Sequence, residues 1–292
     1  MKPAPFKYLA PASVEETLSM LTQYGYEAKL LAGGQSLIPT MNFRLAQPAV
    51  IIDLNRVSEL AYMRPGDSGG LCIGAMARQR EGEYHPLFAE RAPLIRETMP
   101  HVAHPQIRNR GTFGGSIAHA DPAAELPAVM LALNAGFKIR GREGEREIPA
   151  RDFFVGMFAT AMQPEELLTE ILIPPLPPRS GWAFKEVARR HGDYALAGAA
   201  AVVSLNEQQR CREARLVFLS VGDGPVEARG AVQALAGEIP GEEVIRAAAE
   251  TAAAVDIDPG SDIHASAEFR RHLARVLAVQ VLHQAYERAR RA

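Results

Sequence analysis

Two glycine-rich segments, far apart in the sequence, constrain this chain more than any other feature. The first is Ala32-Gly33-Gly34-Gln35-Ser36, which follows an apolar run, and the second is Gly111-Thr112-Phe113-Gly114-Gly115-Ser116. Paired glycines allow positive φ angles and a close approach of the backbone to a ligand. Consecutive free N–H groups in such turns form a concave site for anions, and a diphosphate is a frequent guest. One such segment would fit a plain turn, but two in one chain predict a bound dinucleotide.

Composition places the chain among ordinary globular proteins. It has 292 residues, of which 47% are hydrophobic and 23% are charged, and its net charge is −2. That length allows two or three domains, and a charge so near zero gives no indication of nucleic acid or a membrane surface as a partner. No apolar run approaches the roughly 20 residues of a membrane span, and residues 1–6 lack a signal-peptide core. We therefore expect a cytoplasmic location and no transmembrane segment.

The two cysteines, Cys72 and Cys211, lie far apart in the sequence. Their spacing argues against a disulfide framework and lacks the CxxC pattern of zinc and iron–sulfur sites. Cys72 lies between Leu71 and Ile73, so we expect a buried strand there. If the protein belongs to an iron–sulfur redox system, the cluster must lie on another chain.

The first 56 residues predict a small α/β unit. Ser13 to Glu16 forms a capping-box pattern, apolar residues follow at helical spacing, and Gly25 closes the helix. Strands are expected at 28–32 and 49–54. The first glycine segment follows a strand, but there is no GxGxxG pattern and Pro39 interrupts the next stretch, which disfavours a Rossmann domain.

The middle of the chain predicts a mixture of helices and strands. A polar, basic loop over residues 101–110 leads to the second glycine segment. Asp121-Pro122 combines an N-cap with proline at the first helical position. The expected strands are 71–75, 137–140, 147–148 and 167–173, with a hairpin between the second and third, and the expected helices are 87–99 and 121–134.

A proline-rich connector predicts a domain boundary. Residues 174–178 hold four prolines in five positions, which makes a stiff, extended segment. Beyond it we expect strands at 183–188, 195–205 and 214–221, and helices at 226–236, 242–255 and 264–291. The predicted division is residues 1–175, with subdomains of about 1–56 and 57–175, and residues 181–292.

Three segments of the chain resemble signatures of one family, the FAD-binding subunits of molybdenum hydroxylases. Leu31 to Leu37 resembles the first flavin-binding loop of that family, and Ile107 to Pro122 resembles the second. His191-Gly192-Asp193-Tyr194-Ala195 is similar to a third signature, a Gly-Asp-aromatic-Ala turn. The family includes the medium subunit of carbon monoxide dehydrogenase and the FAD domain of xanthine dehydrogenase. The resemblance extends over nearly the whole chain.

The resemblance implies both a fold and a function. The implied fold is α+β: a two-subdomain FAD-binding fold of the vanillyl-alcohol oxidase type, followed by a C-terminal domain of three-stranded antiparallel sheet plus helices. The implied function is electron transfer through FAD in a heterotrimer. Because Gln35 occupies the first loop and no cysteine lies near either loop, we predict that FAD is held non-covalently. A large subunit carries molybdopterin, a small subunit carries two [2Fe–2S] clusters, and heterotrimers commonly pair. Electrons pass from the clusters to FAD and on to an external acceptor.

The resemblance also assigns roles to individual residues. The diphosphate of FAD would lie between the two glycine segments, on Ala32, Gly33, Gly34, Gln35, Ser36, Thr112, Gly114, Gly115 and Ser116. Phe113 is expected to pack rather than to make a polar contact. Asp121 is either a helix cap or an acceptor for a ribose or ribityl hydroxyl. Tyr194 either covers the flavin ring or faces the core. Lys185 either stabilises charge on reduced flavin or is solvated.

Several alternatives stay open from the sequence. His101, His104, Arg108 and Arg110 could contact phosphate, face the iron–sulfur subunit or make structural hydrogen bonds, whereas Pro105 and the lack of a third ligand argue against a metal there. The arginines of the last predicted helix are expected in water. A stand-alone FAD-dependent oxidase or reductase of the same fold, and a regulatory nucleotide-binding module, are the competing functions. The substrate and the acceptor stay open, although the lack of an NAD-binding pattern favours a quinone or another non-pyridine acceptor.

Overall fold

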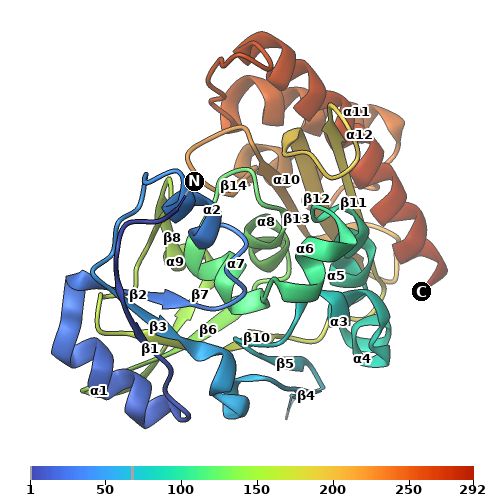
Figure 1. Cartoon of the computed structure of the whole chain (residues 1–292). Helices are drawn as coiled ribbons and strands as arrows, with labels where there is room; N and C mark the ends of the chain where they lie inside the picture. The colour runs from blue at the N-terminus through green and yellow to red at the C-terminus, as the bar shows by residue number, and fades with distance from the viewer. Residues whose placement is uncertain (1, 67–68) are drawn as a thin grey trace.

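The N-terminal unit is a three-stranded parallel sheet covered by one helix. The computed structural model describes residues 2–66 and 69–292 (Figure 1). Strands β1 (Lys7–Leu9), β3 (Val50–Asp53) and β2 (Ala28–Leu31) lie side by side in that order. Helix α1 (Val14–Tyr24) begins as predicted, because Ser13 Oγ accepts a hydrogen bond from Glu16 N at 3.1 Å. Apolar residues of α1 pack on β3 and complete a small core.

A five-stranded antiparallel sheet forms the second unit. Its order is β4 (Met63–Pro65), β5 (Leu71–Gly74), β10 (Leu167–Ile173), β6 (Gly136–Gly141) and β7 (Gly144–Pro149). The predicted strands and the predicted hairpin of β6 and β7 are confirmed. A short hairpin of β8 (Phe154–Gly156) and β9 (Ala159–Thr160) follows helix α9 (Ala150–Phe153). Short 3-10 turns occupy Gly25–Glu27, Leu54–Arg56, Ser58–Leu60 and Met99–His101.

The prediction of one helix over residues 87–99 is wrong. Helix α3 (Gln79–Tyr84) is followed by two short helices, α4 (Pro86–Arg91) and α5 (Pro93–Thr98). Pro93 lacks an N–H group and restricts the residue before it, so Ala92 leaves the helical region at φ −142° and ψ 56°. The predicted loop over residues 101–110 is also wrong. Pro105 instead occupies the first turn of helix α6 (Pro105–Arg110), where a missing N–H costs nothing.

The two glycine segments, predicted as loops, and the region after Asp121, predicted as a helix, also differ from expectation. The first segment leads into the short helix α2 (Leu37–Asn42). The second forms the start of helix α7 (Phe113–His119), with Thr112 as its N-cap. The helix expected from residue 121 begins at Glu125 as α8 (Glu125–Ala132). Asp121 Oδ1 accepts from Ala123 N at 2.9 Å, and the resulting turn delays the helix.

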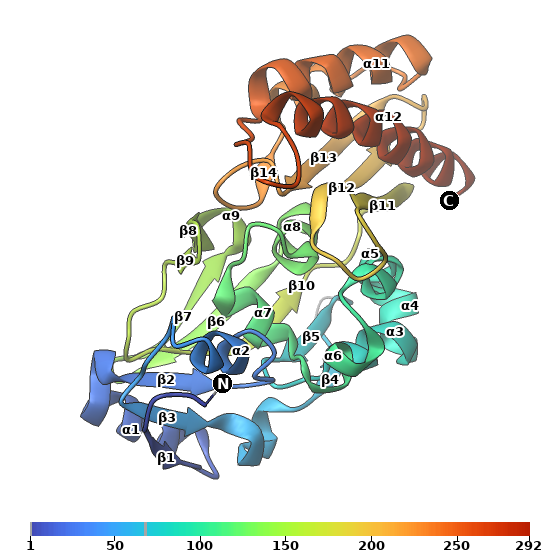
Figure 2. The same cartoon turned by 45° about the horizontal axis from the view of Figure 1, so that its top comes forward.

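The C-terminal part is an antiparallel sheet with helices on one face. Strands β11 (Ser180–Ala188), β12 (Ala195–Leu205) and β13 (Cys211–Leu219) confirm the three predicted strands, and β14 (Val226–Glu227) adds a fourth. The helix expected from 226 therefore starts later, as α10 (Arg229–Leu235). Helices α11 (Glu242–Thr251) and α12 (Ala267–Arg291) follow, with a π-helical turn, Ala252–Asp256, between them. Figure 2 shows α11 and α12 on one side of this sheet and the two N-terminal sheets on the other.

The middle core extends across the proline-rich connector. Phe184, Val202 and Val217 of the C-terminal sheet are buried in the same cluster as α5, α8 and β10. The opposite face of that sheet packs on α10, α11 and α12 in a second cluster. The C-terminal sheet is thus covered on both faces. The division into residues 1–175 and 181–292 stays a prediction. None of the helices in the described part of the chain is long and apolar enough to cross a membrane.

The arginines of α12 do not all lie in water, contrary to expectation. Arg270 is buried and donates to Leu196 O at 2.6 Å and to Asp262 Oδ2 at 2.6 Å. Arg288 donates to Glu97 Oε2 at 2.5 Å and to Trp182 O at 2.6 Å. These two side chains thus tie α12 to backbone carbonyl groups of β12 and β11. Arg291, near the end of the helix, is exposed as expected.

Candidate functional site

A cavity of about 800 Å³ lies where the two glycine segments meet. Ligand sites in proteins commonly have volumes between roughly 300 and 1,000 Å³. The walls come from β2, α2, α6, α7, α8, the β8–β9 hairpin and the turn before β12. Its lining includes Leu30, Ala32, Gly33, Gly34, Gln35, Ser36, Leu37, Thr40, Val102, Ala103, Thr112, Gly115, Ser116, His119, Asp121, Glu125, Phe158, Ala159, Thr160, Gly192, Asp193 and Tyr194.

The first glycine segment presents unpaired backbone amides to this cavity. The N–H groups of Gly34, Gln35, Ser36 and Leu37 have no hydrogen-bond acceptor among the described residues. Gly34 has φ +75°, in the left-handed region that favours glycine. Four consecutive free amides at the start of a helix are the donor set that an anion such as diphosphate requires.

Glycine is required at position 33 because there is no space for a side chain. A Cβ atom at this position would lie 2.4 Å from the carbonyl oxygen of Arg110 and 2.7 Å from Gly111 Cα. The backbones of the two glycine segments are therefore in direct contact. The position of the second segment fixes where the free amides of the first segment lie.

The second glycine segment uses its amides within the protein. Phe113 N donates to Ala77 O at 3.0 Å, Gly114 N to Ala75 O at 2.9 Å, and Gly115 N to Thr112 Oγ1 at 3.0 Å. Gly114 does not line the cavity, because it packs against Ala75, whose Cβ would lie 2.5 Å from an added Cβ. Thr112, Gly115 and Ser116 do line it. The structure thus favours the first segment, rather than both, as the source of backbone donors.

The third signature forms a turn at the edge of the cavity. Gly192 has φ +85°, and a Cβ there would lie 2.3 Å from the ring of His104. The turn therefore packs on the start of α6. Tyr194 is 69% exposed and lines the cavity, so it does not face the core. Asp121 also lines the cavity while it holds the turn before α8. Lys185, in the middle of β11, is not part of the lining.

Glu125 is a cavity residue that the sequence analysis missed. It is the first residue of α8, only 7% exposed, and it lines the cavity. Burial, together with the nearby Glu186 and Asp121 carboxylates, raises the pKa of its carboxyl group to about 8. At neutral pH Glu125 therefore keeps its proton and can donate a hydrogen bond. The signal in the sequence was a single acidic residue at the head of an apolar run.

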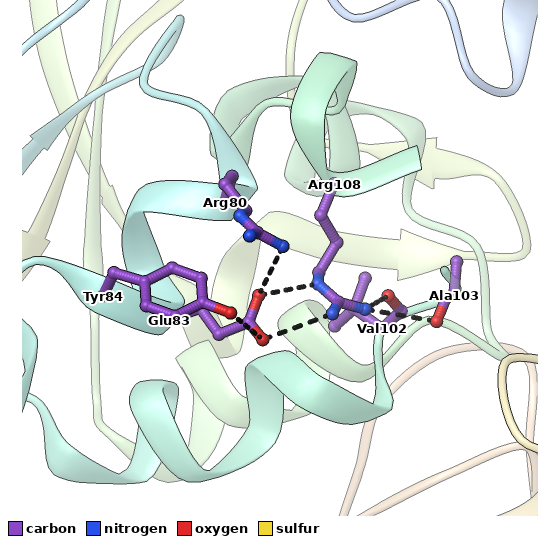
Figure 3. Close-up of polar contacts among 6 residues, drawn as sticks. All are labelled: Arg80, Glu83, Tyr84, Val102, Ala103 and Arg108. Atoms are coloured by element: carbon purple, nitrogen blue, oxygen red, sulfur yellow. Dashed lines mark hydrogen bonds and ion pairs between the residues drawn. The ribbon is translucent and has the colours of Figure 1, made fainter. Parts of the chain in front are cut away.

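In the basic stretch before the second glycine segment, Arg108 makes structural hydrogen bonds, which is one of the alternatives left open by the sequence. Its buried guanidinium donates to Val102 O at 2.8 Å, to Ala103 O at 3.2 Å and to Glu83 Oε2 at 3.1 Å (Figure 3). Val102 and Ala103 line the cavity, and Ala103 has φ 45°. Arg108 makes structural hydrogen bonds that hold this wall in place. His101, nearby, faces Glu186 Oε1 at 3.4 Å.

Comparisons with known proteins agree with this geometry. A family model described as the FAD binding domain in molybdopterin dehydrogenase matches residues 4–176. A second, described as the CO dehydrogenase flavoprotein C-terminal domain, matches residues 182–285. The chain belongs to this molybdopterin dehydrogenase flavoprotein family. The family resemblance and the α+β fold predicted from the sequence are both confirmed.

Relatives of this flavoprotein cover its whole length. It is 42% identical to the 6-hydroxypseudooxynicotine dehydrogenase complex subunit alpha of Paenarthrobacter nicotinovorans, over 99% of this chain and 97% of that one. A solved carbon monoxide dehydrogenase from Hydrogenophaga pseudoflava superimposes with a TM-score of 0.95 and 38% identity, covering 99% of both chains. Quinoline 2-oxidoreductase from Pseudomonas putida 86 gives a TM-score of 0.93 at 38% identity, covering 99% of both chains. The chain is thus a flavoprotein subunit of an oxidoreductase.

The residues of the cavity fit FAD, the cofactor of this family. Free amides at Gly34 to Leu37 match a diphosphate, and the hydroxyls of Ser36 and Ser116 have no hydrogen-bond partner among the described residues. Cys72 and Cys211 are buried outside the lining.

Proposed function

We propose that this flavoprotein is the electron-transfer subunit of a heterotrimeric molybdenum hydroxylase. In this arrangement it holds FAD between the [2Fe–2S] clusters of a small subunit and an external electron acceptor, while a large subunit carries molybdopterin. The full-length likeness to subunits of carbon monoxide dehydrogenase and of a dehydrogenase complex supports this proposal. A cytoplasmic location and a dimer of heterotrimers are part of it.

One observation carries the proposal: four consecutive amides, free of protein acceptors, line a cavity large enough for a dinucleotide. We assign the diphosphate to the amides of Gly34 to Leu37, with Ser36 and Ser116 as further donors. Asp121 is placed to accept from a ribose or ribityl hydroxyl. When bound, FAD supplies an isoalloxazine ring that exchanges electrons with other centres.

The remaining cavity residues would orient the ring and control access to it. Tyr194 is exposed at the cavity and is placed to cover one face of the ring. Glu125 holds a proton at neutral pH inside the cavity. We assign no catalytic residue to this chain, because its side chains bind and orient. Both cysteines lie outside the lining, which supports non-covalent attachment.

The substrate of the complex is assigned to the large subunit. The named relatives act on carbon monoxide, quinoline and 6-hydroxypseudooxynicotine, yet the fold is shared. A chain that keeps its fold across such different reactions serves a common step. That common step is electron transfer.

Electron flow through this chain can be tested in the purified complex. Gly33→Ala should yield a complex that retains iron and molybdenum but carries less FAD, because the new Cβ meets the Arg110 carbonyl. After anaerobic reduction with dithionite, wild-type clusters should reoxidise rapidly on addition of a quinone analogue, and the Gly33→Ala clusters should reoxidise much more slowly. Equal rates in the two complexes would contradict the proposal. Gly260→Ala, at a position with nothing within 4 Å, is the matched control.

A further inference from the structure

Asn55, Arg78 and Arg110 lie beside the glycine segments but outside the lining of the cavity. Arg78 follows β5 and forms an isolated β-bridge with Thr112. Its neighbour Gln79 donates from the backbone to Gly111 O at 2.9 Å. The backbone of Arg78 is thereby fixed against the second glycine segment.

The side chain of Arg78 connects both segments. Nη1 donates to the carbonyl oxygen of Arg110, and Nη2 donates to Asn55 Oδ1 at 2.7 Å. Asn55 Nδ2 then donates to the carbonyl oxygen of Ala32 at 3.0 Å. One guanidinium therefore links Ala32 with Arg110 through two backbone carbonyls. The planar fork of donors in arginine suits this double contact, and lysine cannot reproduce it.

This connection acts at the point where the two segments touch. The Arg110 carbonyl that Arg78 holds is the one that would meet a Cβ at Gly33. Asn55 is itself held, because Asn55 N donates to Asp53 Oδ1 at 2.9 Å and Tyr8 OH donates to Asp53 Oδ2 at 2.6 Å. A displacement of either carbonyl would move the backbone that leads into the free amides.

Arg78 also places a positive charge near those amides. The carboxylate that acts on this charge is that of Asp53, which accepts a hydrogen bond from Asn55 and partly offsets the positive charge of Arg78. Burial and the neighbouring Arg110 lower the pKa of Arg78, but an arginine keeps its proton in proteins. A half-buried cation beside an anion site strengthens attraction for a diphosphate.

We propose that Arg78 is a positioning residue for FAD. Through Asn55 and the Arg110 carbonyl, it holds the amides of Gly34 to Leu37 in the arrangement that takes the diphosphate, and so sets the affinity for FAD. This inference rests on the proposed placement of the diphosphate at the first glycine segment.

The test measures FAD affinity of the full-length apoprotein by quenching of flavin fluorescence, at a temperature well below the melting temperature of every variant. Loss of one charge-assisted contact to the segment predicts that Arg78→Gln weakens FAD binding by about tenfold. Arg78→Lys should weaken it nearly as much, because the fork is lost. Arg142→Gln is the matched control, since Arg142 is exposed in the turn between β6 and β7 and does not line the cavity.

A double-mutant cycle separates positioning from a general loss of stability. Asn55→Ala should also weaken FAD binding, and Arg78→Gln combined with Asn55→Ala should be no worse than Arg78→Gln alone, because both act through one connection. An affinity of Arg78→Gln within twofold of wild type, or fully additive effects, would overturn the inference. If Gly33→Ala also binds FAD like wild type, the placement of the diphosphate itself has failed. If Gly33→Ala weakens FAD binding but Arg78→Gln does not, the placement of the diphosphate stands and the inference about Arg78 fails.

Discussion

At the scale of single residues, Gly33 is the position where the two glycine segments meet. Gly33→Ala forces a Cβ to within 2.4 Å of a backbone oxygen, so one segment must shift. We expect the free energy of unfolding to fall by about 1–3 kcal/mol, as for other overpacked sites, and FAD affinity to fall by about tenfold or more. Urea unfolding and FAD titration measure the two effects. If Gly33→Ala behaves like Gly260→Ala in both, the described contact is wrong.

The raised pKa of Glu125 makes the free energy of unfolding depend on pH, and it also determines the sign of that dependence. The folded chain keeps the Glu125 proton up to about pH 8, whereas the unfolded chain releases it near 4.5. Between these values the folded state binds more protons, so this group makes the free energy of unfolding fall as pH rises from about 5 to 8. Glu125→Gln removes that dependence. Above pH 8 the variant should be more stable than wild type by a few kcal/mol, and near pH 4 the two should be similar.

Urea unfolding of the apoprotein from pH 4 to pH 9 checks this prediction. The relevant quantity is the difference between Glu125→Gln and wild type, since other titrating groups contribute equally to both. Glu207→Gln, at an exposed turn position, is the control and should run parallel to wild type. Parallel curves for Glu125→Gln would show that Glu125 does not hold its proton.

Some functional residues could be identified from the sequence and others could not, and the two groups differ in what determines their role. Gly33 and Gly34 stood out because glycine pairs have few other uses than tight turns and close contacts. Glu125 did not, because its protonation depends on burial that only the folded chain creates. Lys185 is a lone charge in an apolar strand, which suggests a role, yet the strand places it outside the cavity lining.

At the scale of elements, Thr112 decides where α7 begins. Its hydroxyl accepts from Gly115 N at 3.0 Å, and its side chain is almost fully buried. Loss of an N-cap costs about 1 kcal/mol, so Thr112→Ala should lower the free energy of unfolding by that amount. Thr112→Ser keeps the acceptor and should restore most of it. Thermal unfolding of both variants tests this, and equal stabilities would rule out the cap.

Strands were easier to predict than helices in this chain. The strands β5, β10 and β12 are mostly apolar, because almost all of their residues are buried. The helices α4, α5 and α6 each begin with proline, and proline marks a helix start as readily as a helix end. Only the folded chain shows which of the two applies at Pro93 and Pro105. The second glycine segment became a helix because Thr112 supplied a cap.

At the scale of the whole molecule, Arg288 joins the C-terminal helix to the middle unit. It donates to Glu97 Oε2 and Trp182 O, and its guanidinium lies 5.3 Å from the centroid of the Trp182 ring. Arg288→Ala should lower the free energy of unfolding by about 1–3 kcal/mol, because Glu97 loses a charged partner. For a chain of this size that corresponds to a melting temperature lower by about 2–4 °C per kcal/mol.

A double-mutant cycle with Glu97→Gln should show coupling between the two positions, measured by thermal unfolding. Arg291→Ala, at an exposed position three residues further along α12, should change stability by less than about 0.5 kcal/mol. Additive effects of Arg288→Ala and Glu97→Gln would mean that the contact does not join the two parts. The sequence could not identify this contact, since Glu97 and Arg288 lie far apart in the chain.

The most direct test of the proposed function is to isolate this chain with its partners and determine which chain carries the flavin. The complex would be purified gently through a tag on this chain, its visible spectrum recorded, its chains and metals counted, and the protein then precipitated with acid. We predict flavin absorption together with two further chains, iron and molybdenum, and release of the flavin into the acid supernatant. Flavin on a stable single chain, flavin retained in the pellet, or no flavin even after addition of FAD would contradict the proposed function.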